Sequence, residues 1–387
     1  MEHPSELRGR ALAFLSLLWL LWFMNIGSRA IFSPVLPLVE DEFAINHARA
    51  SSIFMFQSLG YGVSLFFSGL YAGRFGYRKS IGLSLGISSA VSFAIPFAKS
   101  VPVLYVLSCI SGFAAGVYLP SALPVITEYF AERQWGKAIA IHDSGASCSI
   151  FCTPFIVLLL LRFLYWRGIF AVFGVVFFAC TLVFLLASDE MRVARQRTWV
   201  HGDLLKRRAL WIMVTMWIFG AGANWGLYFT IPLYLTKELS LGIGYANTVL
   251  GVSRLGGIGV AILCGVLIDK FSLRRITFTL LSLTGLLTVA VGVVSARFVG
   301  AALFFQVIFV TGFFPVGLVS IARTFDAKTR GAATGFILAL SVMAGGGIVP
   351  YLLGLSGDLI SFRFGFVLLG VMVALSSLLL FRLKELD

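Results

Sequence analysis

Charged side chains are scarce in this 387-residue sequence, and that scarcity excludes an ordinary soluble fold. Asp, Glu, Lys and Arg make up 12% of the chain, whereas a soluble domain carries about 25%. Hydrophobic residues make up 59%, which is more apolar surface than a soluble core can enclose. The composition therefore predicts a membrane protein.

Signals of catalysis and of nucleotide use are also missing. No G-x-x-x-x-G-K-[ST] phosphate-binding loop occurs, so transport driven directly by ATP is not indicated. No nucleophile, metal-ligand cluster or cofactor loop stands out, so we expect no enzymatic activity, no metal and no cofactor. Cys148 and Cys152 share a helix face at i, i+4. Without a second ligand pair nearby, this pattern fits packing better than a metal or disulfide site.

Long apolar stretches recur along the whole chain. A helix needs about 20 mostly apolar residues to cross roughly 30 Å of hydrocarbon. Twelve stretches meet this length, at residues 11–38, 50–72, 79–98, 101–127, 137–161, 168–187, 209–235, 243–268, 275–296, 298–321, 331–355 and 362–382. The first runs far beyond the apolar core of a signal peptide, so we expect it to be retained as a helix. The sequence predicts an all-α membrane protein with twelve transmembrane helices.

The placement of Lys and Arg predicts the orientation of these helices. Of the 30 basic residues, 21 fall in one set of alternate loops, seven in the other, and Arg29 and Arg254 within predicted spans. The positive-inside rule then places both termini in the cytoplasm of a multi-pass protein of the plasma (inner) membrane. The net charge of +13 is explained by this orientation, so nucleic-acid binding is not indicated.

A short basic turn occurs once in each half of the chain. The segment GLYAGRFGYRK (69–79) is echoed 196 positions later by GVLIDKFSLRR (265–275). A second pair, Asn25-Ile-Gly27 and Asn224-Trp-Gly226, recurs at an offset of 199. Such internal repeats are typical of secondary transporters. We predict two six-helix bundles, residues 1–187 and 209–387, joined by a polar cytoplasmic linker at 188–208.

These loops, together with WRGIF (166–170) and TRGAA (329–333), resemble the major facilitator superfamily across essentially the whole chain. The resemblance implies transport by alternating access, with the repeated loops as cytoplasmic gates. Gly73 stands where the family has an acidic residue, and Ser272 where it has a glycine. The resemblance assigns eight residues to the gates: Gly69, Arg74, Gly76, Arg78, Gly265, Asp269, Lys270 and Arg274. Glu128, near the cytoplasmic end of the fourth predicted span, is also expected at a gate.

Two arginines within predicted spans indicate an anionic substrate. An ionised side chain near the bilayer centre costs about 2.5 to 3.5 kcal/mol on insertion scales, so such residues usually mark a pathway. Arg29 precedes Pro37 at a spacing similar to that of a helix-1 arginine in the organophosphate and organic-anion branches. Arg254 resembles the helix-8 arginine of oxalate, monocarboxylate and nitrate carriers. We expect both guanidinium groups to bind carboxylate or phosphate; a structural role for Arg29 is the alternative.

His142 and Asp143 adjoin each other near the start of the fifth predicted span. Histidine titrates near neutral pH and a buried carboxylate can accept a proton, so either could carry the coupling proton. Pairing of one of them with a basic residue at the gate is the alternative. We also expect polar and aromatic side chains to line the cavity: Asn25, Gln57, Tyr118, Asn224, Trp225 and Tyr228.

The sequence thus predicts a monomeric secondary transporter in the lipid bilayer that moves a small organic anion, with a proton as coupling ion. Multidrug efflux within the same superfamily is the first alternative. Two elements of the proton–drug antiporters are missing, since Ser108 replaces a helix-4 arginine and TPFI (153–156) replaces G-P-x-x-G-G. A transporter-like receptor or scaffold that moves nothing is the second alternative.

Overall fold

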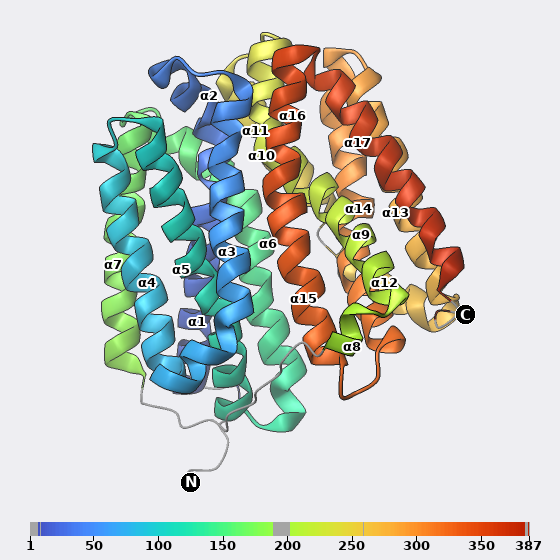
Figure 1. The fold of residues 1–387 in the computed structure, drawn as a ribbon. Helices are drawn as coiled ribbons and strands as arrows, with labels where there is room; N and C mark the ends of the chain where they lie inside the picture. The colour runs from blue at the N-terminus through green and yellow to red at the C-terminus, as the bar shows by residue number, and fades with distance from the viewer. Residues whose placement is uncertain (1–6, 8, 189–201, 258, 384–385, 387) are drawn as a thin grey trace. The chain divides into compact units, whose positions relative to one another are not determined.

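The computed structural model describes residues 7, 9–188, 202–257, 259–383 and 386, without the side chains of residues 68–73, 261–262 and 269. Figure 1 shows a succession of long helices joined by short turns, and no strand occurs among the described residues. The predicted all-helical membrane fold is confirmed.

The helices follow one another with few intervening residues. Those of the N-terminal half are α1 (Gly9–Ala30), α2 (Phe32–Phe43), α3 (His47–Phe75), α4 (Tyr77–Ala94), η1 (Ile95–Phe97), α5 (Val101–Tyr129), η2 (Glu132–Gln134), α6 (Trp135–Leu160) and α7 (Trp166–Ala187). The remainder are α8 (Gly202–Leu205), α9 (Arg208–Ala221), η3 (Gly222–Gly226), α10 (Leu227–Leu233), η4 (Tyr234–Glu238), α11 (Ile243–Ser253), η5 (Arg254–Gly257), α12 (Val260–Lys270), α13 (Leu273–Val293), α14 (Ala296–Thr324), α15 (Arg330–Met343), η6 (Ala344–Ile348), α16 (Val349–Leu359), α17 (Phe362–Ser377) and η7 (Leu378–Arg382). Of these, η3, η4 and η6 are single π-helical turns.

The predicted span 243–268 does not form, in its described residues, a helical stretch long enough to cross a membrane. Eleven helical stretches within the described ranges are long and apolar enough to cross a membrane. The predicted span 243–268 is instead divided into α11 and α12 by η5 and by Gly259, whose φ is +78°. A Cβ atom at Gly256 would lie 2.7 Å from the carbonyl oxygen of Phe304 on α14. The glycines therefore permit both a left-handed turn and a close helix approach, and Arg254 lies at the break.

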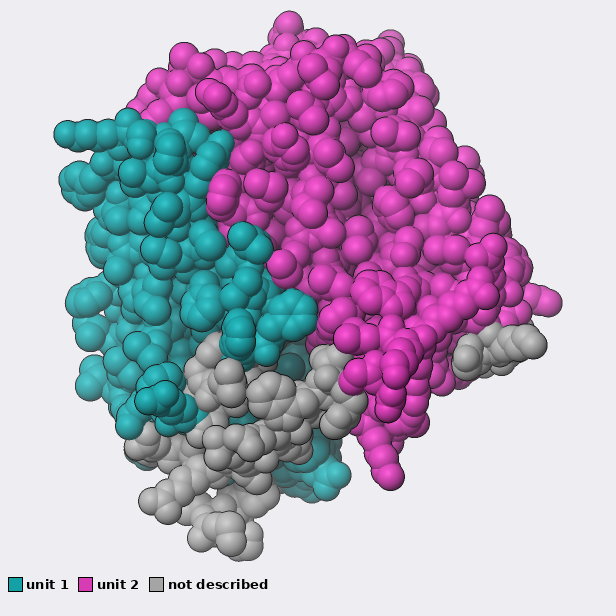
Figure 2. All heavy atoms as spheres, in the orientation of Figure 1, with its two compact units in different colours: residues 1–32, 59–197 teal, residues 33–58, 198–387 magenta. Residues whose placement is uncertain are grey.

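The chain forms two compact units, coloured separately in Figure 2. Unit 1 contains Met1–Phe32 and Leu59–Arg197, and unit 2 contains Ser33–Ser58 and Thr198–Asp387. In unit 1, α4 packs on α5 and α7, and α1 packs on α6; in unit 2, α13 packs on α14 and α17, and α9 packs on α15. Nearly all of α2 and the first part of α3 therefore pack with the C-terminal half. The boundary at 188–208 stays a prediction, and residues 189–201 of that linker lie outside the described residues.

The break between α1 and α2 follows from the prolines after it. Pro34 has no N–H group to donate to the carbonyl of Ala30, so the helical ladder is interrupted. On the unit 2 side, Ser33 Oγ donates to the carbonyl of Tyr228 at 2.6 Å. The carbonyl of Pro34 accepts from Asn247 Nδ2 at 3.1 Å. The interruption is therefore satisfied by polar partners, and Arg29 lies in the last turn before it.

Candidate substrate site and gates

One face of α1 carries the polar and aromatic residues Trp22, Asn25 and Arg29, which are spaced at i, i+3 and i+7. Arg29 is only 3% exposed, and its Cζ lies 4.0 Å from the ring centroid of Tyr61 on α3. A desolvated cation–π contact contributes about 2 kcal/mol, close to the insertion cost of a buried arginine. Asn25 Nδ2 donates to the carbonyl of Ala115 on α5 at 3.2 Å, whereas its Oδ1 has no hydrogen bond among the described residues.

His142 on α6 lies in a stack of three rings within unit 1. Its ring centroid is 5.8 Å from that of Trp22 and 5.9 Å from that of Tyr118, and both interplanar angles are 14°. The Tyr118 hydroxyl donates to the carbonyl of Leu18 at 2.8 Å and lies 3.2 Å from His142 Nε2. A hydroxyl has one proton to donate, so Nε2 must be the donor toward it. Nδ1 is then the basic nitrogen, and it is buried without a hydrogen bond in the described part of the chain.

Asp143 differs from its neighbour in environment. His142 is fully buried, whereas Asp143 is exposed in this structure. Because adjacent helical residues point about 100° apart, the imidazole and the carboxylate have different surroundings. The structure therefore distinguishes the two candidate proton carriers by position.

Arg254 is held in unit 2 by polar and aromatic contacts. Its Nη1 donates to Asn224 Oδ1 at 2.7 Å, and its Nη2 donates to the Asn224 carbonyl at 3.4 Å. The Cζ atom lies 4.7 Å from the ring centroid of Tyr228. No acidic side chain among the described residues pairs with this guanidinium. A fixed positive charge without a counter-ion is suited to an anionic ligand.

The backbone around Asn224 is arranged by a local change in helical pitch. Asn224 lies in the π-helical turn η3, which frees carbonyl groups from the regular ladder and is a feature often found at functional sites. Gln306 Nε2 on α14 donates to the Ala223 carbonyl at 3.0 Å and to Thr288 Oγ1 at 3.3 Å. A Cβ at Gly226 would lie 2.8 Å from Val349 Cγ1, so the turn also packs tightly against α16.

The other predicted lining residues are divided between the two units. Gln57 belongs to unit 2, where it is 1% exposed and its Nε2 has no hydrogen bond within the described ranges. Trp225 is half-buried, with its ring centroid 6.2 Å from Tyr228 and 5.5 Å from Phe229. Asn25, Arg29 and Tyr118 belong to unit 1, and Asn224, Tyr228 and Arg254 to unit 2.

Sequence reasoning missed several residues of these clusters. Tyr61 and Trp22 were not distinguished from the many other aromatic residues in apolar stretches. Ser149 and Thr153 lie opposite Gly27, where a Cβ would approach their hydroxyl oxygens to 3.2 and 3.7 Å. Both hydroxyls are buried without a hydrogen bond in the described part. A search for polar residues sharing the helix face of His142 would have found Ser149, which lies seven positions later.

The two repeated loops begin their helices differently. Gly76 precedes α4 with a left-handed φ of +79°. The equivalent Ser272 has φ −61°, and its hydroxyl accepts from the backbone N–H of Arg275 at 3.3 Å as an N-cap of α13. The two halves therefore use a flexible glycine and a capping serine for the same purpose.

The remaining gate residues lie near the ends of helices. Arg78 Nε donates to Ser188 Oγ at 3.2 Å, and the Arg274 guanidinium donates to the Leu383 carbonyl. Arg74 lies with its Cζ 5.9 Å from the ring centroid of Phe75. Four further gate residues follow: Glu128 and Lys270 are exposed, Gly265 lies within α12 and Gly69 within α3. The side chain of Asp269 lies outside the described residues.

The structure gives the positions of Cys148 and Cys152 and of the other side chains that could bind a metal ion. The Sγ atoms of Cys148 and Cys152 lie 3.7 Å apart as free thiols. No group of three or more His, Cys, Asp or Glu residues in the described ranges is placed to hold a metal ion.

Comparison with known proteins gives a consistent family assignment. A model of the Major Facilitator Superfamily matches residues 18–300. The gallate transporter of Pseudomonas putida is 22% identical over 385 aligned positions, covering 89% of this chain and 85% of that protein. A solved bacterial homologue of the human lysosomal transporter Spinster, inward-facing and unoccupied, has a TM-score of 0.82 at 13% identity and 98% coverage of both chains. A D-xylose–proton symporter has a TM-score of 0.80 at 15% identity, covering 97% of this chain and 98% of that one.

The family match extends over more than half of the sequence. Arg29 and Arg254 lie within apolar segments, each next to a helix interruption. This chain belongs to the Major Facilitator Superfamily. It is a multi-pass membrane protein and a transporter. The likeness to the solved structures, at 13 to 15% identity, concerns the fold.

Proposed function

We propose that this transporter moves a small carboxylated or phosphorylated organic anion by alternating access, with a proton as the coupling ion. The observation that carries the proposal is the Arg254 guanidinium, which lies at a helix break with Asn224 and Tyr228 as its partners. A cation placed in a low-dielectric environment attracts an anion far more strongly than it does in water.

The contacts of Arg254 leave part of its donor set for a ligand. A guanidinium has five N–H donors in a planar fork, and Asn224 receives bonds from Nη1 and Nη2. Nε is buried without a hydrogen bond in the described part of the chain. A carboxylate or phosphate can engage such a fork in two parallel bonds, which a point charge such as lysine cannot reproduce.

Arg29, in unit 1, is the second basic group of the proposal. Tyr61 covers one face of its guanidinium, so the group is held in a fixed direction. We propose that Arg29 and Arg254 both contribute to substrate binding, with Asn25, Gln57 and Trp225 as further lining residues. The gallate transporter relative supports an anionic substrate, because gallate is itself a carboxylate.

His142 is the better of the two candidate proton carriers. Its Nδ1 lone pair is buried beside the rings of Trp22 and Tyr118, and aromatic faces stabilise an adjacent cation. The proposal also includes inner-membrane localisation with both termini in the cytoplasm, as the distribution of Lys and Arg predicts.

The test is anion uptake into proteoliposomes containing purified protein. A thermal-shift screen of carboxylates, phosphates and sulfonates, beginning with gallate, identifies the probe, because a ligand stabilises the state it binds. Loss of a charge-assisted hydrogen bond costs about 1.5 to 3 kcal/mol. We therefore expect Arg254→Ala to weaken binding of the probe by roughly 10- to 150-fold.

Two variants complete the design. Arg254→Lys keeps the charge without the fork and should have an intermediate affinity, while Arg323→Gln removes an exposed charge at the end of α14 and should transport normally. Full uptake by Arg254→Ala would refute the site. Stabilisation by hydrophobic cations and by none of the anions would favour multidrug efflux instead.

A further inference from the structure

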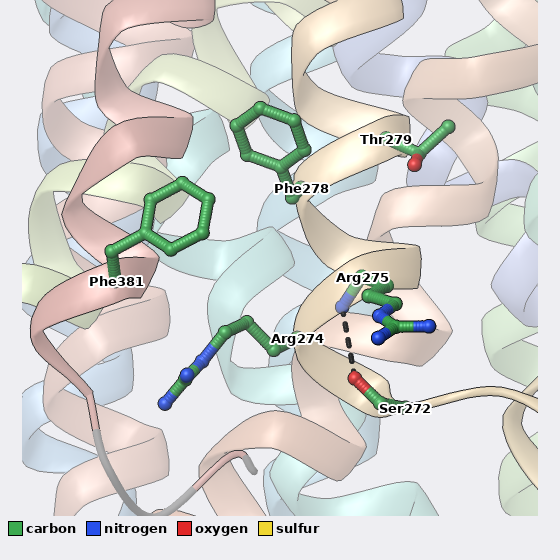
Figure 3. A pocket seen from close by; sticks show the side chains of 6 residues that line it. All are labelled: Ser272, Arg274, Arg275, Phe278, Thr279 and Phe381. Atoms are coloured by element: carbon green, nitrogen blue, oxygen red, sulfur yellow. Dashed lines mark hydrogen bonds between the residues drawn. The ribbon is translucent and has the colours of Figure 1, made fainter.

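A pocket of about 510 Å³ lies at the beginning of α13, within unit 2 and apart from the proposed substrate site. It is lined by Ser272, Arg274, Arg275, Phe278, Thr279 and Phe381. Figure 3 shows the two phenylalanine rings on one side of the pocket and the two arginines with Ser272 on the other. The pocket therefore has an apolar side and a basic side.

A second hollow of about 280 Å³ extends from the first along α13 and shares Phe278 with it. Its walls include Leu286 on α13, Val371 and Leu375 on α17, and Leu378 on η7. Leu286 is 60% exposed and Leu375 is 53% exposed. In a membrane-spanning segment such side chains face lipid, so the hollow is an apolar groove open to the bilayer.

Close packing of α13 on α17 forms the floor of this groove. A Cβ at Gly285 would lie 2.6 Å from the carbonyl oxygen of Gly370 and 2.6 Å from the backbone nitrogen of Ala374. The hydroxyl oxygens of Ser282 and Ser377 are 2.9 Å apart. Small residues let the two backbones meet, and the larger side chains on either side leave room for a chain between them.

The basic side of the pocket has a charge available for a ligand. The Arg275 side chain is exposed, and no acidic residue in the described part of the chain pairs with its guanidinium. Arg274 also lines the basic side of this pocket, and its guanidinium donates to the Leu383 carbonyl. Basic pockets between transmembrane helices, at the level where the helices end, are typical binding places for anionic lipid headgroups.

We infer that this surface binds one anionic phospholipid. Its phosphate lies against Arg275 and Arg274, and one acyl chain lies in the groove between α13 and α17. The two hollows adjoin through Phe278, as phosphate and acyl chain adjoin in a phospholipid. A soluble anion would use only the basic end, and a neutral lipid only the groove. Neither ligand alone would fill both the basic pocket and the apolar groove.

The experiment measures thermal stabilisation of the full-length protein in a neutral detergent. The probes are dioctanoyl phosphatidylglycerol, dioctanoyl phosphatidylcholine and inorganic phosphate. We expect phosphatidylglycerol to raise the melting temperature in a saturable manner, with smaller effects of the other two. A lysine or arginine near an anionic membrane surface contributes about 1 kcal/mol. Arg275→Gln should therefore weaken the apparent affinity about fivefold.

Two further variants make the result specific. Leu286→Trp fills the groove at an exposed position and should weaken phosphatidylglycerol binding without changing the response to phosphate. Arg323→Gln removes another exposed arginine, in the last turn of α14, and should bind like the wild type. Equal stabilisation by phosphatidylcholine, a full effect of phosphate alone, or equal loss in Arg275→Gln and Arg323→Gln would overturn the inference.

Discussion

Asp358 joins two segments that lie 311 positions apart, and its removal gives a quantitative test of the packing within unit 2. Its Oδ1 accepts from the backbone N–H of His47 at 2.9 Å, and its Oδ2 accepts from that of Ala48 at 2.9 Å. Asn46 Oδ1 accepts from the N–H of Arg49 at 3.0 Å. The first turn of α3 is thus capped by a distant carboxylate at two positions and by its own N-cap residue at the third.

The expected cost of Asp358→Ala follows from these bonds. Loss of an N-cap acceptor costs about 0.5 to 2 kcal/mol, and loss of a negative charge at a helix N-terminus costs about 0.3 to 1 kcal/mol. The local opening free energy of the first turn of α3 should therefore fall by about 1 to 3 kcal/mol. Asp358→Asn keeps one acceptor oxygen and should show about half of this effect.

Amide hydrogen exchange measures this opening directly. At a factor of ten per 1.4 kcal/mol, the amides of His47 and Ala48 should exchange roughly 5- to 150-fold faster in Asp358→Ala. Asn46→Ala serves as the matched control, because it removes one cap from the same turn without breaking the long-range contact. Unchanged exchange at His47 and Ala48 in Asp358→Ala, or an equal acceleration in Asn46→Ala, would refute the reasoning.

Four further variants test the proton carrier and the helix packing. In proteoliposomes, His142→Gln should abolish uptake driven by an inward proton gradient but should leave counterflow of the same anion. Asp143→Asn should retain gradient-driven uptake. The reverse pattern would assign the coupling proton to the Asp143 carboxylate. Gly285→Ala places a methyl group against the backbone of Ala374 and should lower stability by about 1 to 3 kcal/mol. The Cβ added by Gly335→Ala would meet no atom within 4 Å, so this variant should raise stability by up to about 1 kcal/mol. A melting temperature that falls in both glycine variants would contradict the packing argument.

Much of the architecture could be read from local composition. A segment of about 20 apolar residues crosses the bilayer whatever its neighbours are, so the spans and the repeated loops were accessible without coordinates. The interruption at η5 also had a local signal, because Gly256, Gly257 and Gly259 crowd the same part of the predicted span. The sequence predicted a continuous helix there, because an apolar stretch has the same hydropathy whether or not one of its glycines adopts a left-handed φ.

The candidate site was only partly accessible. Arg29 and Arg254 stood out because a charge in an apolar stretch is rare. Their partners Tyr61 and Asn224 follow no fixed spacing from them, since helix packing brings them together. The same holds for His142, whose burial against Trp22 and Tyr118 depends on the rotation of α6 about its axis.

Local features of the sequence were enough to predict a helical membrane protein with a duplicated loop, because apolar length and charge placement act locally along the chain. Transport was predicted from the resemblance of its loops to a known family. Tertiary structure alone decided that Ser33–Ser58 packs with the C-terminal half and that Asp358 caps α3. It also decided which of His142 and Asp143 is buried. These features depend on contacts between residues far apart in the chain, and helix-to-helix geometry sets such contacts without leaving a periodic signal in the sequence.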